Sequence, residues 1–170
     1  MLNRFKAAYL QTSLVLGLIL SGASLALPSD SEQEISIASD QASLSKQKGE
    51  LIYTGNVELI QGSLVIQADK VTLIKNNQGM QKLIAKGNPA RYQQLLSENE
   101  DKTHAYGDTI IYNVINDELT LLENAGLEKQ GNVFAGEKIV YLIKEQRVKA
   151  DSTQQDRVRM VIQPKADKEP

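Results

Sequence analysis

Three acidic side chains recur at matching positions of a repeated segment and suggest a cation site. They are Asp69, Asp108 and Glu137. Calcium takes about six to eight oxygen ligands that converge on one point, and one acid in each of three separate repeats does not supply them. We therefore expect these carboxylates to cap turn amides or to pair with the neighbouring lysines Lys70 and Lys138.

The chain has few of the side chains that enzymes commonly use for catalysis. His104 is the single histidine, and there is no cysteine. A Ser/His/Asp triad would have to use His104, yet no serine lies in a recognisable nucleophile elbow. Disulfides, thiolate zinc sites and thiol nucleophiles are excluded. Carboxylates that folding brings together stay open as an alternative, but we expect no enzyme, no cofactor and no metal.

The composition suits one ordinary domain with an aliphatic interior. The chain has 170 residues, no tryptophan and two phenylalanines, so leucine, isoleucine, valine and alanine must fill the core. The formal net charge of -2 leaves no basic excess to meet a phosphate backbone. We expect no nucleic-acid partner.

The N-terminus has the three parts of a secretory signal peptide. Arg4 and Lys6 precede a short apolar run, and small residues follow it. The run is shorter than the roughly 20 residues that cross a bilayer as a helix. We expect residues 1–26 to be a signal peptide that is cleaved between Ala26 and Leu27. An uncleaved membrane anchor is the alternative, and the body is exported in either case.

The rest of the chain has the alternating pattern of β-strands. Val57 and Leu59 flank a polar residue, as do Val71 and Leu73, and glycine and asparagine residues separate such runs at intervals of about ten residues. Successive strand side chains point to opposite faces, so this spacing builds one continuous apolar wall. We expect an all-β sandwich, barrel or solenoid of roughly a dozen or more mostly antiparallel strands.

Weak internal repetition indicates a stack of similar units. The segment 65–73 resembles 133–141, and 105–112 is a third copy. Such units cannot bury their apolar face singly, so each must cover the next. Because the spacing is irregular, we expect a jelly-roll-like stack with variable loops and not a strict β-helix.

Short motifs that follow one another along most of the chain give a more specific expectation. They are Ile35–Leu44, Tyr53–Val57, Gln67–Val71, Asn88–Ala90, Gly136–Tyr141 and Lys144–Gln146. In this order they resemble the LptA, or OstA-like, family of lipopolysaccharide-transport proteins. The resemblance implies a twisted, slightly open antiparallel β-jelly roll over residues 27–163, and we expect a disordered polar tail at 164–170.

The same resemblance implies a function. It implies a carrier in the periplasm of a Gram-negative bacterium, which binds the lipid A acyl chains of lipopolysaccharide and forms part of a protein bridge between the two membranes. The implied partners are an inner-membrane lipopolysaccharide export complex and an outer-membrane lipopolysaccharide translocon. Ile35 and Ile37 open the first strand, and Val158, Met160 and Ile162 alternate near the C-terminus. Both segments are typical of edge strands, through which copies could also join head to tail.

The period-two alternation and the resemblance together select the residues that line the lipid path. Of these, Ile35, Ile37 and Tyr92 are the sharper predictions, because the corresponding family positions lie near the acyl chains. From the pattern alone, the same residues could be the core of a filled sandwich. The full set is Ile35, Ile37, Tyr53, Val57, Leu59, Leu64, Ile66, Val71, Leu73, Tyr92, Ile110, Tyr112, Phe134, Ile139 and Tyr141.

Two further alternatives stay open from the residues. Lys70, Arg91 or Lys138 could contact lipid phosphates at the rim, since a cation stabilises an anionic headgroup. The chain could also be the membrane-anchored sibling of the same pathway, or a periplasmic interaction scaffold without lipid cargo.

Overall fold

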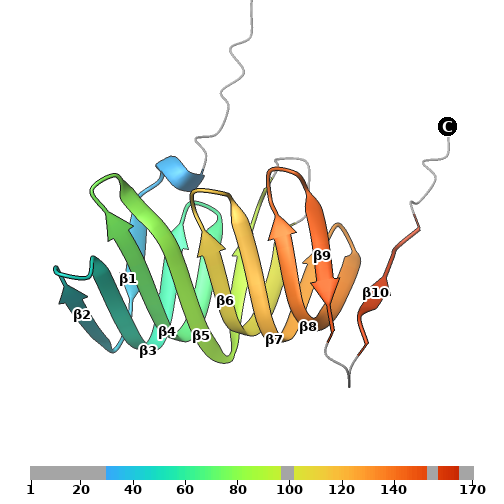
Figure 1. The fold of residues 1–170 in the computed structure, drawn as a ribbon, viewed down its shortest axis with the longest axis horizontal. Coiled ribbons are helices and arrows are strands. Elements are labelled where there is room, and N and C mark those ends of the chain that lie inside the picture. The colour runs from blue at the N-terminus through green and yellow to red at the C-terminus, as the bar shows by residue number, and fades with distance from the viewer. Residues whose placement is uncertain (1–29, 97–101, 153–156, 165–170) are drawn as a thin grey trace, which may run out of the picture.

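The computed structural model describes residues 30–96, 102–152 and 157–164, which form one antiparallel sheet after a short 3-10 helix (Figure 1). Its elements are η1 (Asp30–Glu32), β1 (Ile35–Ala38), β2 (Gln41–Ser45), β3 (Glu50–Gln61), β4 (Leu64–Asn76), β5 (Gly79–Gln94), β6 (Thr103–Asn113), β7 (Glu118–Lys129), β8 (Asn132–Leu142), β9 (Arg147–Asp151) and β10 (Arg159–Val161). The expected signal peptide and its cleavage site at Ala26 and Leu27 lie outside the described residues. Of the expected polar tail at 164–170, residues 165–170 also lie outside the described residues.

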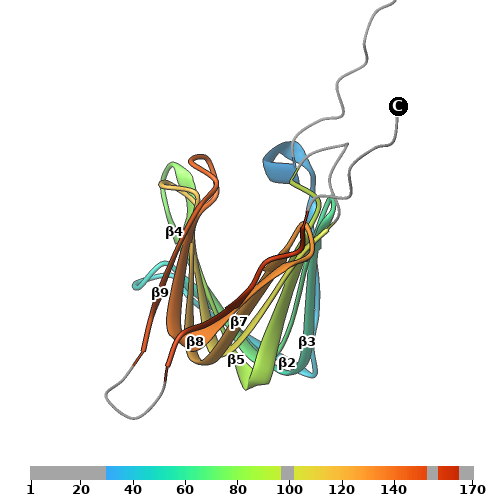
Figure 2. The same cartoon turned by 90° about the vertical axis from the view of Figure 1, so that its right-hand side faces the viewer.

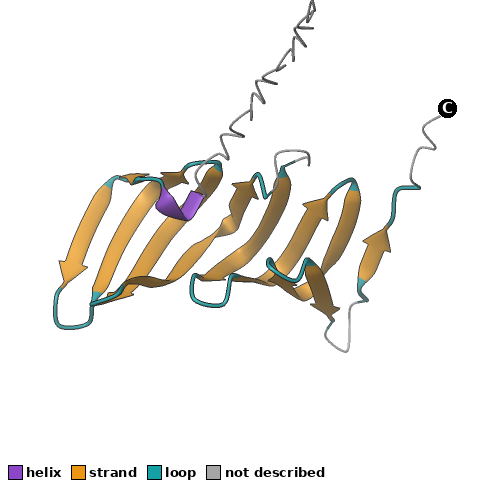
Figure 3. Cartoon of the chain, turned by 90° about the horizontal axis from the view of Figure 1, so that it is seen from above, coloured by secondary structure: helices purple, strands orange, loops and turns teal. Residues whose placement is uncertain are grey.

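The strands follow one another across the sheet almost in chain order. The order is β1-β3-β4-β5-β6-β7-β8-β10, with β2 paired to β3 and β9 paired to β8. Every pairing is antiparallel, as expected. Figure 3 shows the strands side by side along the long axis, with β10 at one end. The two segments expected at edges, β1 and β10, are the two ends of this order.

The sheet is folded along a line through the middle of its long strands. Their pairing shifts register there, for example between Thr54 and Val57 and between Leu122 and Ala125. Bulges of this kind bend a strand sharply. Seen end-on in Figure 2, the sheet is therefore a V that is open along one side. Because each long strand runs through both arms, the described residues hold ten strands, fewer than the roughly dozen expected from turn spacing.

The two arms need separate names. The β1 arm consists of 35–38, 57–67, 90–94, 103–107, 125–136 and 159–161. The β2 arm consists of 41–54, 70–86, 109–122 and 138–151.

Similar side-chain hydrogen bonds recur along the line where the sheet bends. Asn56 donates from Nδ2 to Asp40 Oδ2 at 3.0 Å, and Asn124 donates from Nδ2 to Asp108 Oδ2 at 3.0 Å. Both asparagines have positive φ, which asparagine tolerates better than most residues. Gly55, with φ of 81°, completes the first corner, because a Cβ there would lie 2.2 Å from Asp40 Oδ2. Of the three acids that recur in the sequence repeat, Asp108 thus serves such a corner.

Within the described residues, no helix is long or apolar enough to cross a membrane, and no group of acids or histidine could hold a metal ion.

One apolar core fills the depth of the V. Residues that pair directly across antiparallel strands point to the same face, so the registers define continuous inner rows. The inner row of the β1 arm is Ile37, Leu59, Ile66, Tyr92, Ala105, Leu127, Phe134 and Met160. The rows of the β2 arm are Ala42, Tyr53, Val71, Ala85, Ile110, Leu121, Ile139 and Ala150, then Leu44, Leu51, Leu73, Leu83, Tyr112, Leu119, Tyr141 and Val148.

Candidate functional site

The structure places all fifteen predicted path residues on the inner face of the V. Ten of them are buried: Val57, Leu59, Leu64, Ile66, Val71, Leu73, Tyr92, Ile110, Ile139 and Tyr141. The other five are partly buried and pack against the core: Ile35, Ile37, Tyr53, Tyr112 and Phe134. Whether lipid reaches them stays a prediction.

The depth of the V is packed as an ordinary core. Ile66, Ile110 and Leu121 are fully buried by other side chains of the chain itself. The packing that a filled sandwich would have is therefore found in the depth of the V.

A cavity of about 310 Å³ lies at the open side of the V, between the arms. It is lined by Asp30, Ser31, Gln33, Ile35, Gln61, Leu64, Met80, Gln94, Tyr112 and Val114. Ile35 and Leu64 come from the β1 arm, while Met80, Tyr112 and Val114 come from the β2 arm. The cavity therefore joins the two arms, and its wall combines aliphatic, aromatic and polar groups as small-molecule sites do.

A carboxylate fastens η1 over the β1 side of this cavity. Asp30 Oδ1 accepts a hydrogen bond from the Ser63 backbone N–H at 2.7 Å, and Oδ2 accepts one from Ser63 Oγ at 2.7 Å. Gln94 Nε2 also donates to Asp30 Oδ2 at 2.7 Å. Gln94 in turn accepts a hydrogen bond from the Tyr92 hydroxyl. The hydrogen bonds thus run from η1 down to the apolar inner row.

The upper inner edge of the β1 arm is polar although it is buried. We call Gln61, Gln94, Thr103 and Lys129 the polar rim; each stands two residues above a member of the inner row. Of the described residues, Gln61, Thr103 and Lys129 are the buried polar side chains, exposed by 7%, 1% and 8%. Gln61 Nε2 donates to the Gln33 carbonyl at 3.1 Å. In the part of the chain that the structure describes, Thr103 Oγ1 is buried without a hydrogen-bond partner.

The facing edge of the β2 arm is apolar. We call Met80, Val114 and Ile143 the apolar rim: Met80 and Val114 line the cavity, and Met80 and Ile143 pack against the core. Below it, Tyr112 donates its hydroxyl to Asp117 Oδ1 at 3.2 Å.

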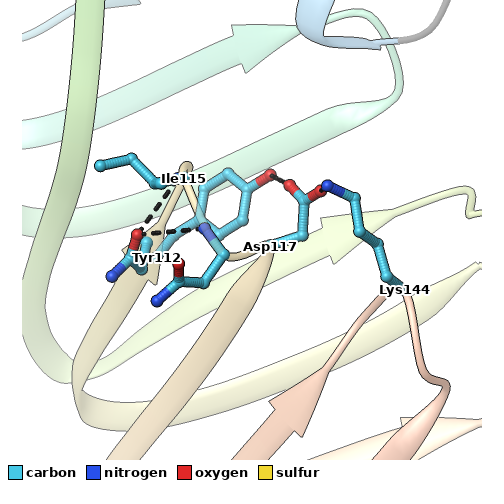
Figure 4. Close-up of polar contacts among 6 residues, drawn as sticks. Tyr112, Ile115, Asp117 and Lys144 are labelled. Carbon is cyan, nitrogen blue, oxygen red and sulfur yellow. Dashed lines mark hydrogen bonds and ion pairs between the residues drawn. The ribbon is translucent and has the colours of Figure 1, made fainter.

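Asp117 also forms an ion pair with the largely exposed Lys144, with 2.8 Å between Asp117 Oδ2 and Lys144 Nζ (Figure 4). Burial and the neighbouring Asp117 charge raise the pKa of Tyr112 well above its usual range. The tyrosine therefore presents a neutral hydroxyl at physiological pH.

The three cations that the sequence offered as an alternative contact for lipid phosphates lie on the outer face. Lys70, Arg91 and Lys138 are exposed, and each neighbours an inward residue on its strand, so each points to the outer face. They are not among the residues that line the cavity between the arms, so the structure gives no support to a phosphate contact there for any of the three. Among the described residues, the buried cation at the inner edge of the β1 arm is Lys129.

Sequence reasoning missed the whole polar rim and part of the wall. The wall residues it missed include Ala105, Leu119, Leu121 and Leu127. A period-two count along β6 and β7 could have found them, because Thr103 stands two residues from Ala105, and Lys129 two residues from Leu127. His104, between two inward residues, is exposed on the outer face.

Comparison with known proteins bears on this arrangement. Residues 36–147 match the family described as LptA/(LptD N-terminal domain) LPS transport protein. The chain belongs to the LptA family. This agrees with the resemblance seen in the motifs.

Individual members of the LptA family match nearly the full chain. Lipopolysaccharide export system protein LptH of Pseudomonas aeruginosa is 39% identical over 153 residues, which are 85% of this chain and 87% of that protein. Lipopolysaccharide export system protein LptA of Escherichia coli is 35% identical over 166 residues, 95% of this chain and 89% of that protein.

A solved structure agrees with the fold. It is the crystal structure of LptH from Pseudomonas aeruginosa, described as the LptA homologous periplasmic component of the conserved lipopolysaccharide transport device. It superposes with a TM-score of 0.74 at 38% identity and covers 81% of this chain and 100% of its own. The expected open antiparallel jelly roll of this family is confirmed.

Proposed function

We propose that this protein carries lipopolysaccharide through the periplasm as part of a protein bridge between the inner and outer membranes. The observation that carries the proposal is the cavity between the two arms, which has an apolar floor continuous with the core and one polar rim. Membership in the LptA family supports it, since its members named above are called lipopolysaccharide export proteins.

The V suits an amphipathic lipid for simple energetic reasons. Each methylene moved out of water contributes about 0.8 kcal/mol, so exposing one long acyl chain costs roughly 10 kcal/mol. An apolar wall between two arms shields the chains, while the open side leaves the charged sugar in water, where its solvation is strongest. The work required is binding and shielding, and we propose a carrier and not an enzyme.

The acyl chains enter between the rims in this proposal. Ile35 and Tyr112 lie on opposite sides of the cavity and meet the lipid first. Ile37, Tyr53 and Phe134 are only partly buried and take part as the arms separate. The fully buried members of the predicted set become accessible only when the core opens, so their contact with lipid depends on that separation.

The two sheet ends suit joints with similarly folded partners. β1 and β10 are short terminal strands whose outer backbone edges have no neighbouring strand among the described residues. Around β10, Val158, Met160 and Ile162 are exposed by 41%, 53% and 65%. Exposed apolar side chains beside an open strand edge favour pairing with another strand.

Such pairing would extend the transport path. The inner row ends at Ile37 on one side and Met160 on the other, so an added sheet continues it in either direction. We propose further copies of this chain, an inner-membrane export complex and an outer-membrane translocon as the partners at these ends.

Export is a part of the proposal that can be checked alone. We propose that residues 1–26 direct secretion and are removed, so that the mature chain begins at Leu27. Intact-mass measurement of the secreted protein tests this. A retained N-terminus would identify the membrane-anchored sibling instead.

A photoreactive residue placed at Ile35 tests lipid binding. Ile35 lines the cavity, and the adjacent Ser36 is exposed and points outward, which makes Ser36 the matched control. After irradiation with lipopolysaccharide, we expect an adduct at Ile35 and little at Ser36. The pair Tyr92 and Arg91 repeats the test deeper in the V. Absence of adducts at both inner positions in folded protein would support the scaffold without lipid cargo.

A further inference from the structure

Thr103 poses a problem that the carrier proposal alone does not solve. It begins β6 with its side chain on the inner face, it is 1% exposed, and its Oγ1 has no hydrogen-bond partner in the described structure. Buried hydroxyl groups in proteins nearly always have a partner, because an unsatisfied one costs free energy. Valine has nearly the same shape and would avoid this cost. A hydroxyl kept here points to a ligand.

The neighbours of Thr103 indicate what that ligand carries. On one side Thr103 pairs directly with Gln94. On the other side, the register of His104 with Glu128 brings Thr103 next to Lys129. Lys129 points inward and is 8% exposed. A hydroxyl donor and an ammonium group thus occupy adjacent positions of the polar rim.

The position of Thr103 and Lys129 along their strands limits the kind of ligand further. Thr103 and Lys129 lie two residues above Ala105 and Leu127, which is about 7 Å along a strand. An acyl chain held against the inner row would have its polar end at this height. Asp30 bonds to Gln94 on the far side of Thr103, so a negative charge is favoured toward Lys129 and away from η1.

We propose that Thr103 and Lys129 form a subsite for a phosphate group on the acylated sugar of the lipid. The subsite rests on the carrier function proposed above and refines it. The Thr103 hydroxyl and the Lys129 ammonium donate to phosphate oxygens, and the charge of the lysine strengthens these bonds. The apolar rim offers no comparable donor at Met80, Val114 or Ile143, so the headgroup faces the β1 arm.

The test compares two probes with matched variants. The probes are lipopolysaccharide and the same preparation after removal of its lipid phosphates. The inner variants are Thr103→Val and Lys129→Met; their controls are Thr72→Val and Lys138→Met, which change the same residue types on the outer face. Binding is measured on purified mature protein, and Thr103→Ser serves as the rescue that returns a hydroxyl.

The subsite predicts a selective loss. The wild-type protein should bind the phosphorylated probe about tenfold more tightly than the dephosphorylated one, since a charge-assisted hydrogen bond is worth about that factor. Thr103→Val and Lys129→Met should each lower affinity for the phosphorylated probe by about three- to tenfold and leave the other probe unchanged. Thr103→Ser and both outer controls should bind like wild type.

Other results overturn the subsite in distinguishable ways. Equal loss for both probes would mean that Thr103 and Lys129 act through packing. Unchanged affinity in both inner variants, with wild type binding both probes, would leave the carrier function standing and remove the subsite. If wild-type protein binds neither probe, the carrier function fails and the subsite fails with it. Thermal unfolding of each variant separates all of these from misfolding.

Discussion

The two arms of the V share one set of strands but end in different chemistry. β7 runs through both: it begins in the β2 arm with Leu119, fully buried, and ends in the β1 arm with Lys129, 8% exposed. Both side chains face the inside, yet one is aliphatic and the other cationic. Burial and apolarity, which usually occur together, are therefore separate properties in this molecule.

The buried side chains of the two arms also differ in how they affect the stability of the fold. The β2 arm is built as a stable core, with leucine and tyrosine in its upper row. The β1 arm buries polar groups, and one of them, the Thr103 hydroxyl, has no hydrogen-bond partner in the described structure and so costs free energy. A protein selected for stability alone would carry apolar rims on both arms. The asymmetry is what a binding site for an amphipathic molecule requires, with one wall for its chains and one rim for its head.

The largest expected effect comes from substitutions that exchange the aliphatic and cationic side chains at the two ends of β7. Leu119→Lys places a charge in a fully buried position without a partner, and we expect a loss of about 4 kcal/mol or more in the free energy of unfolding. Lys129→Leu keeps a buried aliphatic stem and should lower it by less than Leu119→Lys does. Urea unfolding measures both. A mild effect of Leu119→Lys would contradict the distinction between the arms.

Alkaline pH should weaken both arms through their tyrosines. Burial raises the pKa of Tyr92 in the β1 arm, and burial together with the Asp117 charge raises that of Tyr112 in the β2 arm. In the unfolded chain both ionise near the ordinary value of 10.0, while in the folded chain they stay protonated. Their contribution to stability is complete below about pH 10 and is lost as the pH rises above it toward the raised folded values, by at most about 1.4 kcal/mol per tyrosine and pH unit.

Urea unfolding from pH 8 to 11 checks this dependence. Wild-type stability should fall above about pH 10, and Tyr112→Phe should make the fall shallower, since phenylalanine cannot ionise. The comparison with Tyr92→Phe shows which arm dominates. An identical slope in wild type and both variants would mean that these hydroxyls are reached by water in the native state.

The hydrogen bonds and ion pairs formed by Asp30 and Asp117 should also differ in how much they stabilise the fold. Asp30 accepts three hydrogen bonds at 2.7 Å in the β1 arm, whereas Asp117 accepts one at 3.2 Å and pairs with the mostly exposed Lys144. We expect Asp30→Ala to cost about 1–3 kcal/mol and Asp117→Ala about 1 kcal/mol or less. Amide exchange at Ser63 and Leu95, whose N–H groups depend on this network, reports local release of η1. Unchanged exchange in Asp30→Ala would contradict the role given to it.

How far the sequence predicted this molecule also depends on the arm. Alternation at Val57 and Leu59, or at Val71 and Leu73, predicted inward faces in both arms, because a buried aliphatic residue leaves a periodic signal. The V itself was not predicted, since bulges such as the one after Thr54 interrupt pairing without a distinctive residue pattern. Long strands were therefore counted as pairs of short ones.

The sequence predicted the apolar part of the candidate site and missed its polar part. All fifteen predicted path residues face inward, but Thr103 and Lys129 sit between polar neighbours and look like surface residues in the sequence. Their inward direction follows from their two-residue spacing to Ala105 and Leu127 once β6 and β7 are known, and the register with Gln94 and Asn132 in neighbouring strands agrees with it. Pairing between distant segments is what one sequence does not state, and Lys70, Arg91 and Lys138, which the sequence offered for phosphate, lie on the outer face.

The smallest expected effect is the one that runs against intuition. Thr103→Val removes a buried hydroxyl that has no partner in the described structure and replaces it with a methyl group of similar size. Most core substitutions destabilise, but this one should stabilise the lipid-free protein by about 0.5–1 kcal/mol, because the unfolded chain no longer loses hydration of that hydroxyl on folding. Thr72→Val on the outer face should change stability by less, since Thr72 is only half-buried. Thermal unfolding decides: a higher midpoint for Thr103→Val combined with weaker lipid binding would show that the β1 arm keeps this hydroxyl for a ligand, and a lower midpoint would show that the hydroxyl stabilises the fold by itself.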